Sequence, residues 1–221
     1  MMSLSKDVRR QFRHSLESSR CETTPYRHWL FEDALPGPVC DAIVALPYTA
    51  PVALETYGKR ETNNASRTYF NAEARERYPA AAALAEAMQH AEITGLIEKI
   101  CSVDLAGSSL RIEYCQDTDG FWLEPHTDIG VKRFTMLLYL SSEPGCEQWG
   151  TDVYSRPDQH VATAPYRRNA GMIFIPGSNT WHGFRKRPID GVRKSIIINY
   201  VGPEWRARHE LSFPETPVGS A

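Results

Sequence analysis

The feature that most constrains the fold of this chain is a series of eight short β-rich segments after residue 105. They occupy residues 109–115, 120–128, 133–140, 149–155, 160–166, 170–176, 179–185 and 193–201, with turn residues between them. Short strands at such even intervals are typical of antiparallel sandwiches and barrels, whereas parallel strands need a long crossover between them. The pattern therefore predicts a mainly β core in the second half of the chain.

The first half of the chain has mostly helical patterns. Apolar spacing and bracketing prolines predict helices over residues 35–47, 71–91 and 92–104, with strands at 51–58 and 66–71. Residues 5–20 are predicted to form a polar, loosely docked helix. We expect these helices to pack on one sheet, which gives an α+β arrangement in a single domain, 1–221. Its parts are a mixed N-terminal region (1–104), a β core (105–201) and a proline-containing, poorly ordered C-terminal tail (202–221).

Composition excludes several classes of function. A formal net charge of -2 gives no general case for binding nucleic acid or a membrane surface. The mean hydropathy is -0.43, the apolar runs are too short to cross a bilayer, and the N-terminus lacks the apolar core of a signal peptide. The five cysteines form no C-x-x-C pair, which favours reduced thiols over disulfides or zinc. We therefore expect a cytoplasmic protein.

A candidate metal site begins in the stretch "EPHTDIG", where His126 and Asp128 lie two residues apart in an extended segment. Residues at i and i+2 share a face of a strand, so the pair is either part of a metal site or a hydrogen-bonded polar pair. Two imidazoles and one carboxylate on one side of an iron ion are typical of non-haem iron oxygenases. A third ligand must come from another strand, and His160 and His182 are the candidates.

The residues that follow the two histidines favour His182. Eleven residues after His182, Arg193 opens "RKSIIINYV", where Arg193 and Ser195 share a strand face. His160 is followed by the turn "YRRNAG". With this H-x-D…H…R-x-S pattern, residues 109–201 resemble the iron(II)- and 2-oxoglutarate-dependent dioxygenases, and their layout is most similar to the prolyl-hydroxylase-like branch.

The resemblance implies a double-stranded β-helix, an Fe(II) cofactor, and 2-oxoglutarate and O2 as cosubstrates. It implies that His126, Asp128 and His182 are the catalytic iron ligands and that Arg193 and Ser195 bind the distal carboxylate of 2-oxoglutarate. Further residues could contact the cosubstrate or the substrate, by resemblance to the family or by their place near the ligand strands. The cosubstrate candidates are Tyr139, Thr135 and Tyr114, and the substrate candidates are Trp122 and Trp181.

The implied reaction is hydroxylation of a small molecule or an amino-acid-type substrate, with release of succinate and CO2. The carboxylate of Asp128 favours hydroxylation, because related halogenases have a small residue there. A cupin-like binding barrel without redox chemistry and a protein prolyl hydroxylase remain alternatives. Nucleic-acid demethylation is disfavoured, because Arg193 is followed by "KSIIINY" rather than x-N-x-T-x-R. Residues 56–70, rich in polar and turn residues, could form a lid over the substrate.

Overall fold

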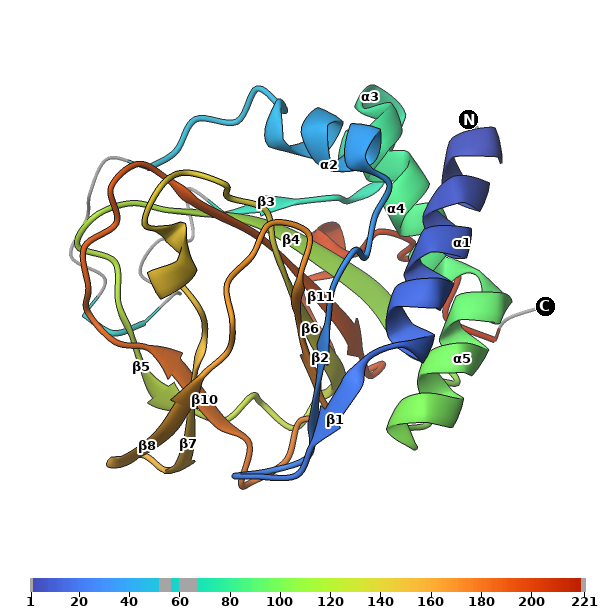
Figure 1. The fold of residues 1–221 in the computed structure, drawn as a ribbon. Helices are drawn as coiled ribbons and strands as arrows, with labels where there is room; N and C mark the ends of the chain where they lie inside the picture. Colours follow the sequence, from blue (N-terminus) through green and yellow to red (C-terminus); the bar gives the residue numbers. More distant parts are fainter. Residues whose placement is uncertain (1, 52–56, 60–66, 220–221) are drawn as a thin grey trace.

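Two antiparallel sheets packed face to face form the centre of the molecule in this computed structural model, which describes residues 2–51, 57–59 and 67–219. The larger sheet has the order β1-β2-β9-β6-β11-β4-β3 and the smaller one β5-β10-β7-β8 (Figure 1). The eight segments predicted after residue 105 all contain strands. These are β4 (Ser109–Asp117), β5 (Leu123–His126), β6 (Lys132–Tyr139), β7 (Asp152–Arg156), β8 (Gln159–Thr163), β9 (Gly171–Phe174), β10 (Trp181–Phe184) and β11 (Arg193–Val201).

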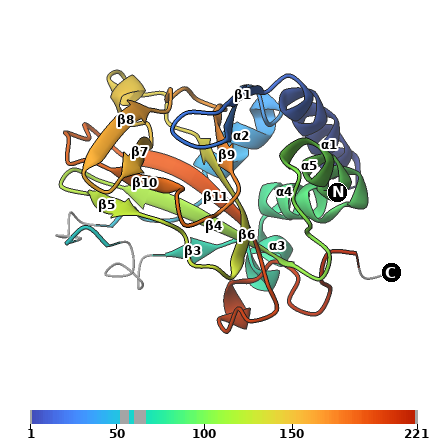
Figure 2. The ribbon, with the colours of Figure 1, turned by 90° about the horizontal axis from the view of Figure 1, so that it is seen from below.

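Helices cover the outer face of the larger sheet, as the apolar patterns predicted. They are α1 (Met2–Glu17), α2 (Gly37–Val44), α3 (Ala72–Arg77), α4 (Pro79–Gln89) and α5 (Ala91–Cys101). Figures 1 and 2 show α1, α4 and α5 gathered on one side of this sheet, away from the smaller sheet. The predicted helix over 71–91 is two helices, because a proline cannot continue the first one and holds the preceding Tyr78 in an extended conformation.

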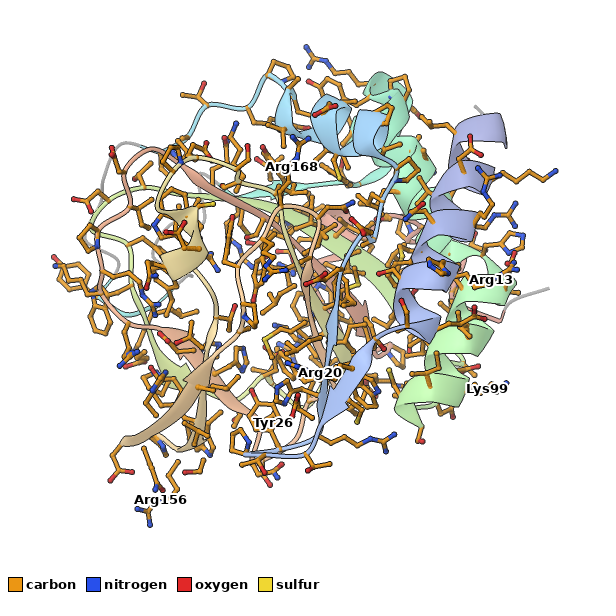
Figure 3. The ribbon with its side chains drawn as sticks, viewed as in Figure 1. Arg13, Arg20, Tyr26, Lys99, Arg156 and Arg168 are labelled. Carbon is orange, nitrogen blue, oxygen red and sulfur yellow. The ribbon has the colours of Figure 1, made fainter. Side chains whose placement is uncertain are left out.

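The first helix is docked rather than loose. Val8, Phe12 and Leu16 recur every four residues, so they lie on one face of α1, and each is almost fully buried in the core beneath the helices. The opposite face is polar, and Figure 3 shows Arg13 and Lys99 at the outer edge of the helical layer. No helix among the described residues is long and apolar enough to cross a membrane.

The N-terminal region also supplies strands that the sequence patterns did not predict. β1 (Arg20–Glu22) and β2 (His28–Phe31) join the larger sheet, and β2 pairs with β9. β3 (Thr68–Tyr69) adds to β4 at the other edge, within the predicted segment 66–71. Part of the predicted strand at 51–58 lies outside the described residues, and residues 57 and 58 form a turn. The larger sheet is therefore built from both halves of the chain.

The C-terminal segment is packed, so the prediction of a poorly ordered tail is wrong. Leu211 bridges Arg111 of β4, and the Ser212 backbone N–H donates to the Leu110 carbonyl. Ser212 and Leu211 are almost completely buried. A short 3-10 helix, η3 (Arg208–Glu210), comes just before this contact. The segment is packed although it contains Pro203 and Pro214. It forms one wall of the cavity described in the next section.

Strand β11 divides its side chains between the two sides of the larger sheet. Ile196, Ile198 and Tyr200 are fully buried in the core beneath the helices. The alternate residues face the smaller sheet, as expected for a strand in which successive side chains point in opposite directions. This second set is Arg193, Ser195, Ile197 and Asn199, and it includes the two residues predicted to share a face, Arg193 and Ser195.

Candidate functional site

Three potential metal ligands meet between the two sheets. His126 ends β5, Asp128 follows two residues later, and His182 lies on β10 directly opposite His126 in the strand register. One ligand atom from each of the three residues lies within 4.8 Å of the others. The arrangement depends on β5 and β10 being neighbours, because this pairing brings together residues more than 50 positions apart in the sequence.

Both histidine rings are oriented so that Nε2 is available as a ligand. His126 Nδ1 lies 2.8 Å from the Glu124 carbonyl oxygen, and His182 Nδ1 lies 3.0 Å from the Thr180 carbonyl oxygen. A carbonyl oxygen only accepts, so each Nδ1 carries the hydrogen, and in the neutral form of either ring Nε2 has the lone pair. Burial, followed by the neighbouring His126, lowers the pKa of His182 to about 4, so its ring is neutral at physiological pH. A neutral imidazole is the form that binds metals.

The carboxylate of Asp128 is held in its ionised form. Burial alone would raise its pKa, but the Lys132 ammonium and the other neighbouring groups lower it to about 2. Lys132 Nζ donates to Oδ1 over 2.5 Å, and the Thr135 hydroxyl donates to Oδ2 over 2.6 Å. Thr135 in turn accepts from Asn199 Nδ2 over 2.9 Å. These contacts fix the carboxylate before any cation arrives.

A cavity of about 540 Å³ opens beside the three ligands. Its apolar lining comes from both sheets and includes Leu137, Phe184 and Ile197. At one end lie the Arg193 guanidinium and Ser195, on the same strand face as predicted. The cavity therefore joins the potential metal ligands to a buried positive charge.

Arg193 is fixed by two of its nitrogens, and its side chain lines the cavity. Nε donates to the Trp149 carbonyl over 2.8 Å, and Nη1 donates to Asp117 Oδ2 over 2.6 Å. Nη2 has no hydrogen-bond partner among the residues that the structure describes. A guanidinium held in this way is suited to bind a carboxylate, because little of its conformational freedom is left to lose.

The three residues predicted to contact the cosubstrate, Tyr139, Thr135 and Tyr114, differ in their position relative to the cavity. The Tyr139 hydroxyl is fully buried and donates to Thr151 Oγ1 over 2.9 Å, so it is Thr151 that lines the cavity. Thr135 lines the cavity and donates to Asp128. The prediction for Tyr114 is corrected, because this side chain lies on the opposite face of β4 and packs against Phe70 beneath the helices.

The two tryptophans predicted near the substrate do not line the cavity. Trp122 packs against Gly58 so closely that a Cβ added to this glycine would come within 2.7 Å of the indole ring. Gly58 has a positive φ of 72°, and its carbonyl accepts from the Glu124 N–H, so this turn is attached to the edge of β5. Trp181 lies on β10 opposite Tyr154. Of the predicted lid at 56–70, residues 58, 59 and 67 line the cavity, and 56 and 60–66 lie outside the described residues.

His160 lies on β8, two strands away from β10 in the smaller sheet. Its Nε2 is 3.2 Å from Asp152 Oδ1, and its ring packs edge-on against Tyr154. It is not part of the three-residue group. Of the two candidates for the third ligand, the structure therefore places His182 beside His126 and Asp128.

Sequence reasoning missed the opposite end of the cavity. Its walls include Lys132 and a group of charged and aromatic residues from β4, the segment before β3 and the C-terminal segment. Arg111 and Glu113 alternate with Leu110, Ile112 and Tyr114 in a strand that is buried almost throughout, and this alternation was the available signal. The remaining members, which no pattern marked, are Arg67, Trp205 and Glu210.

Comparison with known proteins finds no matching family model and no match among curated sequences. Solved structures do match. A prolyl 4-hydroxylase from Phytophthora capsici has a TM-score of 0.60 and 13% identity, over 90% of this chain and 66% of its own. A prolyl hydroxylase from Trichoplax adhaerens, in complex with a hypoxia-inducible-factor peptide, has a TM-score of 0.55 and 11% identity, over 90% and 91%.

HygX from Streptomyces hygroscopicus, with nickel and 2-oxoglutarate bound, has a TM-score of 0.52 and 12% identity, over 81% of this chain and 84% of its own. The chain spans just under two thirds of the Phytophthora enzyme and most of the other two proteins. Identities this low establish the fold rather than the activity. The architecture is a double-stranded β-helix, similar to the fold of these two prolyl hydroxylases and HygX.

Proposed function

We propose that this chain is an Fe(II)- and 2-oxoglutarate-dependent oxygenase that hydroxylates a small molecule or an amino-acid-type substrate. The observation that carries the proposal is that His126, Asp128 and His182 converge beside a cavity whose far end holds the Arg193 guanidinium. Two imidazoles and one carboxylate fit Fe(II) and leave coordination positions open. Arg193 supplies the opposite charge for a dicarboxylate that reaches into the cavity.

The proposed roles follow from the contacts of each side chain. His126 and His182 bind the metal through Nε2, and the Thr135 hydroxyl holds Asp128 in place. Nη2 of Arg193 and the Ser195 hydroxyl bind the distal carboxylate of 2-oxoglutarate. When bound, the metal and the cosubstrate supply the oxidising chemistry, in which decarboxylation to succinate and CO2 is coupled to insertion of oxygen into a C–H bond. Leu137, Phe184 and Ile197 keep the cavity apolar and limit the access of water.

A cupin-like binding barrel without redox chemistry is the rival interpretation. It accounts for a metal site, but it gives no role to a buried arginine aimed at the same cavity. The two interpretations differ in their response to N-oxalylglycine, the unreactive analogue of 2-oxoglutarate. For the oxygenase, metal and analogue together should raise the thermal unfolding midpoint more than metal alone, because ligands that bind only the folded state stabilise it.

The test of activity is formation of succinate from 2-oxoglutarate in the presence of Fe(II), ascorbate and O2. We expect turnover in the wild type, no turnover in His126→Ala or His182→Ala, and a higher requirement for 2-oxoglutarate in Arg193→Ala. His160→Ala is the matched control, because it removes a histidine of the same sheet outside the metal group. Loss of activity in His160→Ala equal to that in His182→Ala would refute the ligand assignment. Failure of metal and analogue to stabilise the wild type would refute the oxygenase.

A further inference from the structure

The end of the cavity away from Arg193 holds a second polar site, here called the ionic subsite: Arg67, Arg111, Glu113, Trp205 and Glu210. Arg193 pairs with Asp117 on β4, and Arg111 lies six residues earlier on that strand. At about 3.3 Å per residue, this separation is roughly 20 Å along the strand. The ionic subsite is therefore separate from the proposed 2-oxoglutarate site, although both line one cavity.

Arg111 is the centre of the ionic subsite and is almost completely buried. Its Nε donates to Glu210 Oε2 over 2.6 Å, and its Nη2 donates to Glu113 Oε2 over 2.8 Å and to the Tyr69 hydroxyl over 3.3 Å. Its Nη1 donates to Asn199 Oδ1 over 3.1 Å. Four of the five guanidinium hydrogens are thus used, and the fifth, on Nη1, has no acceptor in the described part of the chain.

Besides Arg111, the ionic subsite has one hydrogen-bond donor and one acceptor that lack a partner among the described residues. Trp205 Nε1 is buried without a hydrogen-bond partner among the described residues, and its ring lies 5.1 Å from the Arg111 guanidinium carbon. Glu210 Oε2 is taken by Arg111, while Oε1 has no hydrogen bond within residues 2–51, 57–59 and 67–219. A buried N–H without a hydrogen-bond partner costs free energy of folding. A ligand that accepts from this N–H therefore gains more binding free energy than it would from the same contact at an exposed site.

The formal charges of the four described ionic side chains in the ionic subsite balance. Arg67 and Arg111 carry two positive charges, and Glu113 and Glu210 carry two negative charges. A ligand with a net charge would leave an uncompensated charge in this enclosed region, whereas a zwitterion adds none. A zwitterion also offers both a donor for Glu210 and acceptors for Trp205 and Arg111.

A short route connects the ionic subsite to the proposed metal ligand Asp128. Arg111, Asn199 and Thr135 are directly opposite one another on β4, β11 and β6, and a hydrogen-bond chain runs through them to Asp128. Two strand spacings of about 4.8 Å separate β4 from β6. A ligand held at the ionic subsite by its polar end could therefore extend its other end to the metal group.

We propose that the ionic subsite binds the ammonium and carboxylate groups of a free α-amino acid, whose side chain is the part that reacts. Glu210 accepts from the ammonium group, and Trp205 Nε1 and Arg111 donate to the carboxylate. A residue within a peptide has neither charged group, so the subsite selects the free amino acid. This inference rests on the proposed function, since it names the substrate class of the same active site.

The binding test uses protein loaded with Mn(II) and N-oxalylglycine, which cannot turn over. Each of the twenty proteinogenic L-amino acids is titrated by calorimetry, and each one that binds is compared with its N-acetyl carboxamide. We expect at least one free amino acid to bind with a Kd of about 1 mM or tighter. Its blocked form should bind about tenfold to a hundredfold more weakly, the cost of losing contacts to charged groups. Absence of binding by every free amino acid, or equal binding of the blocked form, overturns the inference.

Variants test the assigned atoms. Glu210→Gln keeps an oxygen for Arg111, and Trp205→Phe keeps a ring over it while removing the N–H, so both preserve most of the packing. We expect each to weaken amino-acid binding about tenfold in the same calorimetric titration, with His160→Ala matching the wild type. Unchanged binding in both variants overturns the inference.

The two proposals fail in different ways. If Mn(II) and N-oxalylglycine do not bind to the wild type, the oxygenase itself fails. If they bind and Fe(II) supports succinate formation, but no free amino acid binds, only the assignment of the substrate class fails.

Discussion

Replacing Thr135 with valine tests whether the contacts around Asp128 prepare a metal site. Valine has nearly the shape of threonine but lacks the hydroxyl that donates to Asp128 Oδ2 over 2.6 Å and accepts from Asn199 Nδ2 over 2.9 Å. A hydrogen bond to a charged group contributes about 1.5 to 3 kcal/mol. Loss of the contact should therefore weaken metal binding by about tenfold to a hundredfold, the range typical for partners of metal ligands.

The assay is calorimetric titration with Mn(II), which needs no catalysis and avoids oxidation of iron. Thr135→Ser is the matched control, because serine keeps the hydroxyl and should bind Mn(II) nearly as the wild type does. Thermal unfolding of both variants checks that the fold is intact. If the valine variant bound Mn(II) as tightly as the wild type, or if serine were as damaging as valine, the hydroxyl would have no part in holding Asp128.

The contacts predict whether each of three further substitutions raises or lowers metal affinity or stability. Lys132→Met should tighten Mn(II) binding in the same titration, because the ammonium 2.5 Å from Asp128 opposes a second cation; weaker binding would contradict this. Arg193→Ala should lower the free energy of unfolding in urea by about 3 to 5 kcal/mol, because it removes the cation from a buried ion pair with Asp117, and Arg193→Ala/Asp117→Asn should recover part of the loss. Gly171→Ala should cost about 3 kcal/mol or more in the same assay, because its Cβ would come within 1.9 Å of a backbone oxygen of β6; an unchanged midpoint would refute the close approach.

The fold could be predicted well where the strands have turn residues at both ends. All eight segments after residue 105 became strands because each combines apolar residues with a clear boundary. β1 and β2 were missed because they are three and four residues long, too short for a period to be visible. β2 joins the larger sheet by pairing with β9, a contact between residues about 140 positions apart that local patterns do not reveal, and β1 joins it through β2.

The candidate site could be predicted only where residue types are chemically distinctive. His126, Asp128 and His182 stood out because H-x-D is followed in order by a histidine and by Arg193-x-Ser195, a pattern typical of metal-dependent oxygenases. Tyr114 was misplaced because the alternation along β4 was not used: Leu110, Ile112 and Tyr114 share the face opposite to that of Arg111 and Glu113. Trp205 was missed because its segment has no periodicity, and its position comes from contacts with β4.

The geometry of the site depends on the core beneath the helices, and β11 shows how. Its even-numbered residues Ile196, Ile198 and Tyr200 are fully buried there, and a shift of one residue would move them to the cavity side. The same shift would turn Arg193 and Asn199 away from the cavity. The apolar residues therefore fix the register, and the register places Arg193 opposite Asp117 and Asn199 opposite both Thr135 and Arg111. Because one strand carries both sets, substitutions in the apolar core should disturb the proposed cosubstrate and substrate contacts together.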